Sequence, residues 1–336
     1  MSRLNKMAWV FRYLKNCFGL DMYGYLCDER ERLGNASTSD RSIRSVFYGP
    51  SIPGEKTLRL ILGDCSISLP DNLEHSSSDH YLLESWRGFL ISIEGSDHAK
   101  VFEKTFAEIG YFIEWLVDLM TTCREETVSE IRDYLDSSSY WNDLSQFIPE
   151  NVFVDYQNKE GVSADAIIIM TVITFSYKAL ALYNIELALV AAGDDTSTGF
   201  KNKGILYSWI REKKMAHIFS DYLETLMKGM GYSSKAELGR AMSNSDDPDS
   251  YRRKFDRWMD GESMPSHQDI TDILDCTVRG GETINDFEKS GWLTLYGGVL
   301  FVSRTHEDEL GNYQLPQLYV SWMDDFDKKI KSGDFY

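Results

Sequence analysis

Two arginines three residues apart, Arg41 and Arg44, are the first residues of this sequence whose type and spacing indicate a chemistry. The sequence predicts a short helix over residues 41–48, and this spacing places both arginines on its exposed side. A guanidinium group pairs well with phosphate oxygens, so the two side chains are candidates for contacting a polyanion. Surface arginines are also commonly held in salt bridges, and this second interpretation stays open.

Metal and catalytic chemistry have little support in the sequence. His75 and His80 lie close together beside Asp79, but they offer too few ligands at a suitable spacing for a metal site. The polar loop 193–204 contains adjacent acids and two lysines without a G-x-x-x-x-G-K-[ST] pattern. The chain also lacks a G-x-S-x-G elbow, an H-E-x-x-H pair and a dinucleotide fingerprint. We therefore expect no metal, no cofactor and no enzymatic activity.

The helices that would present basic side chains are clearest in residues 233–277. Ser234 begins one short helix and Asp249 a second, because Ser and Asp side chains accept the unpaired N–H groups of a first turn. Gly261 ends the second helix, and Pro265 precedes a third. Six apolar residues at helical spacing are predicted to face the core: Phe255, Trp258, Met259, Ile270, Ile273 and Leu274.

This arrangement resembles the helix-turn-helix family of phage repressors and Cro. The residues that carry the resemblance are Leu238, Phe255, Arg257, Trp258, Gly261, Pro265 and Ile270. In that family a tight turn joins the first two helices, whereas here about six extra residues, 243–248, lie between them. The resemblance implies DNA contacts from the start of the second helix. It assigns them to Tyr251, Arg252 and Lys254, and it assigns a phosphate contact to Lys235.

A second copy of this pattern occurs near the start of the chain. Shifting the sequence by 212 positions aligns residues 10–65 with residues 222–277 without a gap. Nine aligned pairs are then identical: Leu14/Leu226, Gly19/Gly231, Leu26/Leu238, Arg41/Arg253, Gly49/Gly261, Ser51/Ser263, Pro53/Pro265, Ile61/Ile273 and Leu62/Leu274. Unrelated helical domains can share a glycine stop and a proline start, but the repeated G-x-S-x-P at equal spacing favours a duplication. The sequence thus predicts two divergent modules, and Arg41 and Arg44 are the candidate DNA contacts of the first.

The net charge of −18 is unevenly distributed along the chain. Residues 1–65 carry 10 Lys+Arg against 7 Asp+Glu, residues 66–210 carry 9 against 23, and residues 211–277 carry 10 against 13. Proteins that bind DNA are usually basic where they touch phosphate, and an acidic body repels DNA elsewhere. The charge therefore opposes DNA binding by most of the chain, though not by the first module.

The remaining sequence is predicted to be mainly helical. Apolar periodicity predicts helices over residues 1–20, 22–32, 98–123, 127–135, 164–192, 205–230 and 318–330. The very apolar stretch 164–192 is predicted to be a buried helix, although its β-branched residues leave a strand open as the alternative. A membrane span is not expected there, because charges interrupt the stretch and a bilayer span needs about 20 apolar residues. Residues 292–302 are predicted to form a small β hairpin that turns at Gly297 and Gly298. The predicted domains are residues 1–65, 66–204, 205–277 and a C-terminal extension, 278–336.

The number and spacing of the cysteines indicate the redox state of the protein's cellular compartment. All five are scattered and none has C-x-x-C spacing, which is typical of free thiols in a reducing environment. The first residues also lack the pattern of a signal peptide. We therefore expect a cytoplasmic protein without membrane association.

Two functions follow as expectations. The family resemblance implies a DNA-binding regulatory protein with a mainly α fold. Two helix-turn-helix-like modules would flank an acidic helical domain and act as a pseudo-dimer on neighbouring major grooves, about 34 Å apart. The alternative is a non-enzymatic interaction or assembly protein, either a homo-oligomer or bound to a basic protein partner, whose modules no longer contact DNA. DNA mimicry by the acidic surface is a third hypothesis, and it depends on the spacing of the carboxylates.

Overall fold

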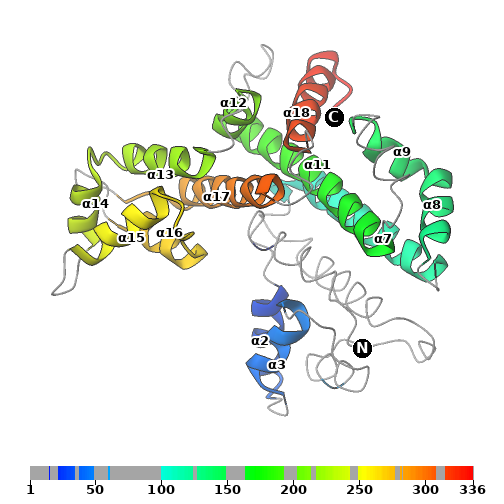
Figure 1. Ribbon diagram of the computed structural model, residues 1–336, viewed down its shortest axis with the longest axis horizontal. Helices are drawn as coiled ribbons and strands as arrows, with labels where there is room; N and C mark the ends of the chain where they lie inside the picture. The colour runs from blue at the N-terminus through cyan, green and yellow to red at the C-terminus, as the bar shows by residue number, and fades with distance from the viewer. Residues whose placement is uncertain are drawn as a thin grey trace. The chain divides into compact units, whose positions relative to one another are not determined.

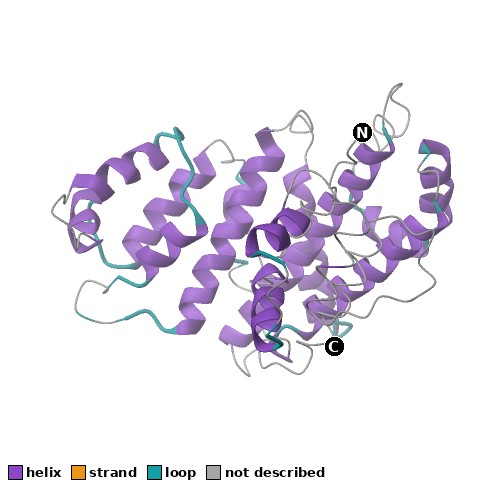
Figure 2. Cartoon of the chain, turned by 90° about the horizontal axis from the view of Figure 1, so that it is seen from below, coloured by secondary structure: helices purple, strands orange, loops and turns teal. Residues whose placement is uncertain are grey.

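The computed structural model describes thirteen stretches of the chain, and every secondary-structure element in them is helical (Figure 2). The described residues are 15, 22–34, 38–48, 60, 100–123, 127–148, 163–192, 203–212, 217–242, 249–276, 281, 283–307 and 315–335. They divide into two compact units. Unit 1 contains the described residues of Met1–Lys15, Leu20–Lys203 and Tyr313–Tyr336, and unit 2 contains those of Gly204–Asn312. The prediction of a mainly α fold is thus confirmed for the described residues.

The centre of unit 1 is the long helix α11, Ala164–Ala192. Helices α7, Glu103–Thr122, and α18, Leu315–Ser332, pack along it (Figure 1), and α8, Val128–Ser137, and α9, Ser139–Ser145, also contact it. All residues of α11 from 170 to 183 are buried. A helix that is covered on all sides is apolar all round, and this explains why its sequence is the most apolar in the chain.

Polar side chains inside α11 are satisfied locally. The hydroxyls of Thr171, Thr174 and Ser176 each donate to the backbone carbonyl four residues earlier, at 2.7 to 3.0 Å. Because a buried hydroxyl without a partner is destabilising, these bonds allow three polar residues to lie in the core. The segment Ala166–Val190 has the length and composition of a membrane span, but 89% of its most apolar window is buried inside the structure. It is therefore a core helix of unit 1.

Side-chain caps define the starts of the smaller helices in unit 1. Thr127 and Glu130 form a capping box at the start of α8, as the prediction of a helix from Thr127 requires. Ser138 then caps α9, and its hydroxyl also accepts a hydrogen bond from the indole nitrogen of Trp115 at 2.8 Å. This bond links α9 to α7.

The helix pair α2–α3 forms the described part of the first predicted module. Helix α2 is Met22–Arg32 and α3 is Asp40–Tyr48. Leu26 and Ile43 are fully buried between the two helices. The buried guanidinium of Arg30 donates to the carbonyl of Thr38 at 2.7 Å and forms an ion pair with Asp40, so one arginine holds the connection between the helices. The helices predicted over residues 1–20 and around Ile61 lie outside the described residues.

Unit 2 contains six helices among its described residues. They are α12, Ile205–Arg211; α13, Ile218–Gly229; α14, Lys235–Met242; α15, Asp249–Met259; α16, His267–Leu274; and α17, Asp286–Glu307. Helix α15 packs on α14 and α13, and α17 contacts α12, α13 and α16 (Figure 1). The stretch predicted as one helix over 205–230 is divided between α12 and α13, with His217 as the N-cap of α13.

The hairpin prediction for residues 292–302 is wrong, because these residues belong to α17. Gly297 and Gly298 lie in the helix interior and are buried, as are the apolar residues from Val299 to Val302. The hydroxyl of Tyr222 on α13 donates to the carbonyl of Trp292 at 3.2 Å. A helix with neighbours on several sides loses its polar face, and its sequence then lacks the 3.6-residue period that distinguishes a helix from a strand.

Candidate functional site

The second helix pair, α14–α15, is held at close range by a glycine. A Cβ atom added at Gly239 of α14 would lie 3.3 Å from the backbone nitrogen of Arg252 on α15. The pair is further packed by Leu238, Phe255 and Trp258, which are all buried. A side chain at this position would crowd Arg252, so glycine favours the close approach of the two backbones. The orientation of α15 is therefore set by packing on its inner face.

The end of α15 follows the prediction. Gly261 has a φ of +74°, in the left-handed region that glycine adopts without strain. The amide of Glu262 donates to the carbonyl of Arg257 at 2.9 Å and that of Gly261 to Trp258 at 3.3 Å, which is a Schellman motif. Ser266 and Asp269 then form a capping box for α16. Three predicted core residues of α16 are buried: Ile270, Ile273 and Leu274.

The outer face of α15 is basic. Arg252, Arg253 and Arg257 are exposed, while Tyr251 and Lys254 are half-buried. On the inner face Phe255 and Trp258 are buried, but Met259, also predicted for the core, is only half-buried. The helix therefore separates an apolar side from a side that carries arginines, as an amphipathic helix does.

Two of the predicted DNA contacts are engaged in ion pairs within unit 2. The ammonium group of Lys235 on α14 lies 2.9 Å from Oδ1 of Asp256, and Nε of Arg252 lies 3.9 Å from Oδ2 of the same carboxylate. One carboxylate thus meets basic side chains from both helices. These pairs are partly exposed, with Lys235 37% and Arg252 55% exposed, and pairs of this kind contribute little stability, about 0–1 kcal/mol.

Lys254 makes a second pair, with an acid of α16. Its ammonium group lies 3.4 Å from Oδ1 of Asp269 and 5.1 Å from the ring centroid of Tyr251. Asp269 also accepts hydrogen bonds from the amide and hydroxyl of Ser266, both at 2.7 Å. Burial by itself would raise the pKa of Asp269, but these hydrogen bonds and the charge of Lys254 outweigh it and hold the pKa below its ordinary value. The carboxylate therefore stays ionised and holds Lys254 in place.

The two arginines predicted as contacts in the first module, by contrast, extend into solvent. Arg41 and Arg44 are both exposed on α3, whereas Ile43 between them is buried. Within the described residues neither arginine has an ion-pair partner. The structure therefore presents Arg41 and Arg44 to solvent, while Lys235 and Lys254 are paired.

Shifting the chain by 212 positions places the two helix pairs in register. The shift carries α2 onto α14 and α3 onto α15, with helix ends that agree within a few residues. Leu26 and its counterpart Leu238 are both buried, as are Ile43 and its counterpart Phe255. Two of the nine identities have both members among the described residues, Leu26/Leu238 and Arg41/Arg253. Of these two, Arg41/Arg253 is the one that core packing does not explain, because both arginines are exposed. Arg253 was not among the predicted contacts, although its alignment with Arg41 could have identified it.

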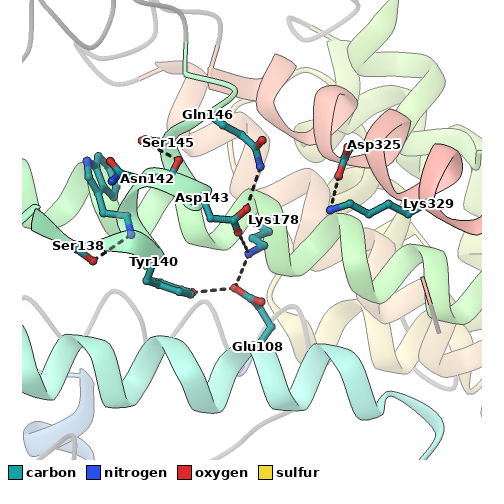
Figure 3. Close-up of polar contacts among 11 residues, drawn as sticks. Glu108, Ser138, Tyr140, Asn142, Asp143, Ser145, Gln146, Lys178, Asp325 and Lys329 are labelled. Carbon is teal, nitrogen blue, oxygen red and sulfur yellow. Dashed lines mark hydrogen bonds and ion pairs between the residues drawn. The ribbon is translucent and has the colours of Figure 1, made fainter. Parts of the chain in front are cut away.

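Unit 1 contains a polar cluster around the buried Lys178 that the sequence did not indicate (Figure 3). The ammonium group of Lys178 on α11 lies 3.0 Å from Oε1 of Glu108 and 2.9 Å from Oδ2 of Asp143. The hydroxyl of Tyr140 donates to Glu108 at 2.8 Å, and Lys178 also lies over the ring of Trp322 at 5.0 Å. Burial, with the nearby charge of Glu108, raises the pKa of Tyr140 far above its ordinary value. Lys178 thereby joins α7, α9, α11 and α18, which is a stabilising role.

Neither a metal site nor a known relative identifies the function. Among the described residues no group of three or more His, Cys, Asp or Glu side chains is placed to hold a metal ion; His75 and His80 lie outside them. No family model, no curated protein and no solved structure matches this chain. A function has to be inferred from the residues and their geometry.

Proposed function

We propose that this chain binds double-stranded DNA through the exposed arginines of α3 and α15. The observation that carries the proposal is the pair Arg41 and Arg253, which are identical at equivalent positions of two otherwise divergent helix pairs. Both side chains are exposed, so core packing does not require their identity. Contact with a phosphate backbone by both helix pairs accounts for it, because guanidinium groups supply such contacts.

The distribution of charge on α15 supports the same role. Its exposed side carries Arg252, Arg253 and Arg257, while its apolar side packs into unit 2. Such a helix can lie against a polyanion without disturbing the core. The overall charge of −18 means that affinity has to come from local basic faces, and repulsion from the acidic remainder should keep it modest and strongly dependent on salt.

The test is binding to mixed duplex fragments at about 50 and 200 mM salt, because a basic footprint of several phosphates loses orders of magnitude in affinity over that range. Arg41→Ala with Arg253→Ala should weaken binding and reduce the slope of log affinity against log salt by about 2, one for each phosphate contact. Arg211→Ala, which removes one exposed arginine from α12, is the matched control for the single variants Arg41→Ala and Arg253→Ala, each of which should reduce the slope by about 1. No binding of the unaltered protein at the lower salt, or equal losses in the control, would refute the proposal.

A second candidate function is protein–protein interaction or assembly without DNA. The observation that favours it is the pairing of Lys235 with Asp256 and of Lys254 with Asp269, because these two lysines are already neutralised within unit 2. This function predicts a stable oligomer or a basic partner and no salt-dependent DNA affinity. Sedimentation equilibrium that finds only monomer, together with salt-dependent DNA binding, would exclude it.

A further inference from the structure

The two helix pairs differ in charge at one equivalent position. The shift of 212 positions aligns Arg44 of α3 with Asp256 of α15, and Tyr23 of α2 with Lys235 of α14. In the second pair, Asp256 neutralises Lys235 across the two helices at 2.9 Å. In the first pair, a cation stands in place of that carboxylate, and it is exposed. The same structural position therefore adds a positive charge to one pair and removes one from the other.

We infer that Asp256 is an internal competitor for polyanions at the α14–α15 pair. Its two oxygens face Lys235 and Arg252, at 2.9 and 3.9 Å, from adjacent helices. A backbone phosphate offers oxygens of similar charge and would bind the same two cations. Phosphate therefore has to compete with Asp256, above all for Lys235, the closer of the two cations. The α2–α3 pair is then the stronger contact, and the α14–α15 pair is the weaker one.

The surroundings of Asp256 allow such a displacement. Its side chain is 42% exposed, so it can rotate into water and remain solvated. Asp269, the partner of Lys254, is 21% exposed and is held by two hydrogen bonds from Ser266 in the capping box of α16. Removing Asp269 from Lys254 would break that cap. Asp256, rather than Asp269, is consequently the exchangeable carboxylate.

The inference is tested with Asp256→Asn and with Asp260→Asn as its matched control. Asp260 is exposed one helical turn further along, so both variants remove one negative charge from nearly the same place. Binding is measured to heparin and to a mixed DNA duplex, each over a salt series. Asp256→Asn should raise affinity about three- to tenfold more than the control and should steepen the salt slope by about 1, because the ammonium group of Lys235 becomes available.

A double variant separates competition from a general change in charge. If Asp256 acts by occupying Lys235, the gain of Asp256→Asn should largely disappear when it is combined with Lys235→Ala. Equal gains for Asp256→Asn and Asp260→Asn, or a gain that persists without Lys235, would overturn the inference. Asp256→Ser provides a second substitution, which should also bind more tightly than Asp260→Asn. Thermal melts by circular dichroism check that each variant is folded.

The choice of DNA as the polyanion rests on the proposed function, but the outcomes are distinguishable. If the unaltered protein does not bind the duplex at low salt, the proposed function fails. The comparison of Asp256→Asn with Asp260→Asn on heparin still decides whether Asp256 is a competitor. If the duplex is bound and the two variants are equal on both probes, the inference fails and the proposed function stands.

Discussion

Replacing Lys178 by methionine should strongly destabilise unit 1. The substitution keeps most of the aliphatic stem but removes the cation that stands between Glu108 and Asp143 (Figure 3). The side chain of Lys178 is only 8% exposed, so its charge is almost entirely solvated by the protein. Removing one partner of a buried ion pair leaves the other charge without compensation.

The expected magnitude depends on how well each remaining carboxylate reaches water. Asp143 is 53% exposed and can be solvated, whereas Glu108 is 16% exposed and, among the described residues, keeps the hydrogen bond from the Tyr140 hydroxyl. Breaking a buried pair costs about 3–5 kcal/mol, and the partial exposure of Glu108 favours the lower end, about 3 kcal/mol. Asp143→Asn alone should cost less than about 1 kcal/mol. Lys178→Met combined with Glu108→Gln should recover at least half of the loss, because the amide oxygen still accepts from Tyr140 and no charge remains buried.

Native-state hydrogen exchange of α11 peptides is the suitable assay, because it reports the opening of unit 1 separately from unit 2. Lys328→Met is the control, since Lys328 is an exposed lysine on α18, and it should change the free energy of opening by less than about 0.5 kcal/mol. The reasoning is refuted if Lys178→Met stays within about 1 kcal/mol of the unaltered protein. It is also refuted if neutralising Glu108 gives no recovery.

Gly239→Ala should destabilise unit 2 by a net of about 0.5–2 kcal/mol, because crowding of its Cβ, 3.3 Å from the backbone nitrogen of Arg252, exceeds the gain in helix propensity. Gly110→Ala, with nothing within 4 Å, should instead stabilise unit 1 by roughly 0.5–1 kcal/mol. Denaturant unfolding of the two variants checks that their free energies of unfolding change in opposite directions. Burial raises the pKa of Glu186, although hydrogen bonds from Thr105 and the backbone partly offset the shift. The folded chain thus holds that proton more tightly than the unfolded chain, so stability should fall as pH rises from about 4.5 through the folded pKa. Thermal melts of Glu186→Gln should show a flatter pH dependence, and an unchanged one would contradict this. Burial also raises the pKa of the Cys123 thiol to about 11. Iodoacetamide at about pH 8 should therefore alkylate Cys123 only after unfolding, and mass spectrometry detects the product.

Local signals predicted many of the helices because the signals act within a few residues. The helix over 164–192 was predicted with the bounds that α11 has, and its start and composition are properties of that segment alone. The stop at Gly261 likewise depends on the conformational freedom of one residue. The prediction failed at α17, where Gly297 and Gly298 suggested a turn. Burial by neighbouring helices determines the structure there, and those helices lie far away in the sequence.

The candidate site was predicted in part for the same reason. Helical spacing placed Arg41 and Arg44 on an exposed face, and the family resemblance assigned Arg252 to the contact surface; all three are exposed. Spacing does not report which cation meets which carboxylate. Lys235 and Asp256 are 21 residues apart. Arg253 was missed although its alignment with Arg41, which helical spacing had placed on an exposed face, could have identified it.

The sequence by itself determined the mainly helical character, the apolar faces of most helices and the duplicated pattern, since each depends on residue type and short-range spacing. Tertiary structure decided that α17 is a helix, that Lys178 lies between two carboxylates, and that Asp256 neutralises Lys235. Lys178 and Asp143 are 35 residues apart. The energy of such a contact depends on burial and distance after the helices have packed, and no local pattern encodes either quantity.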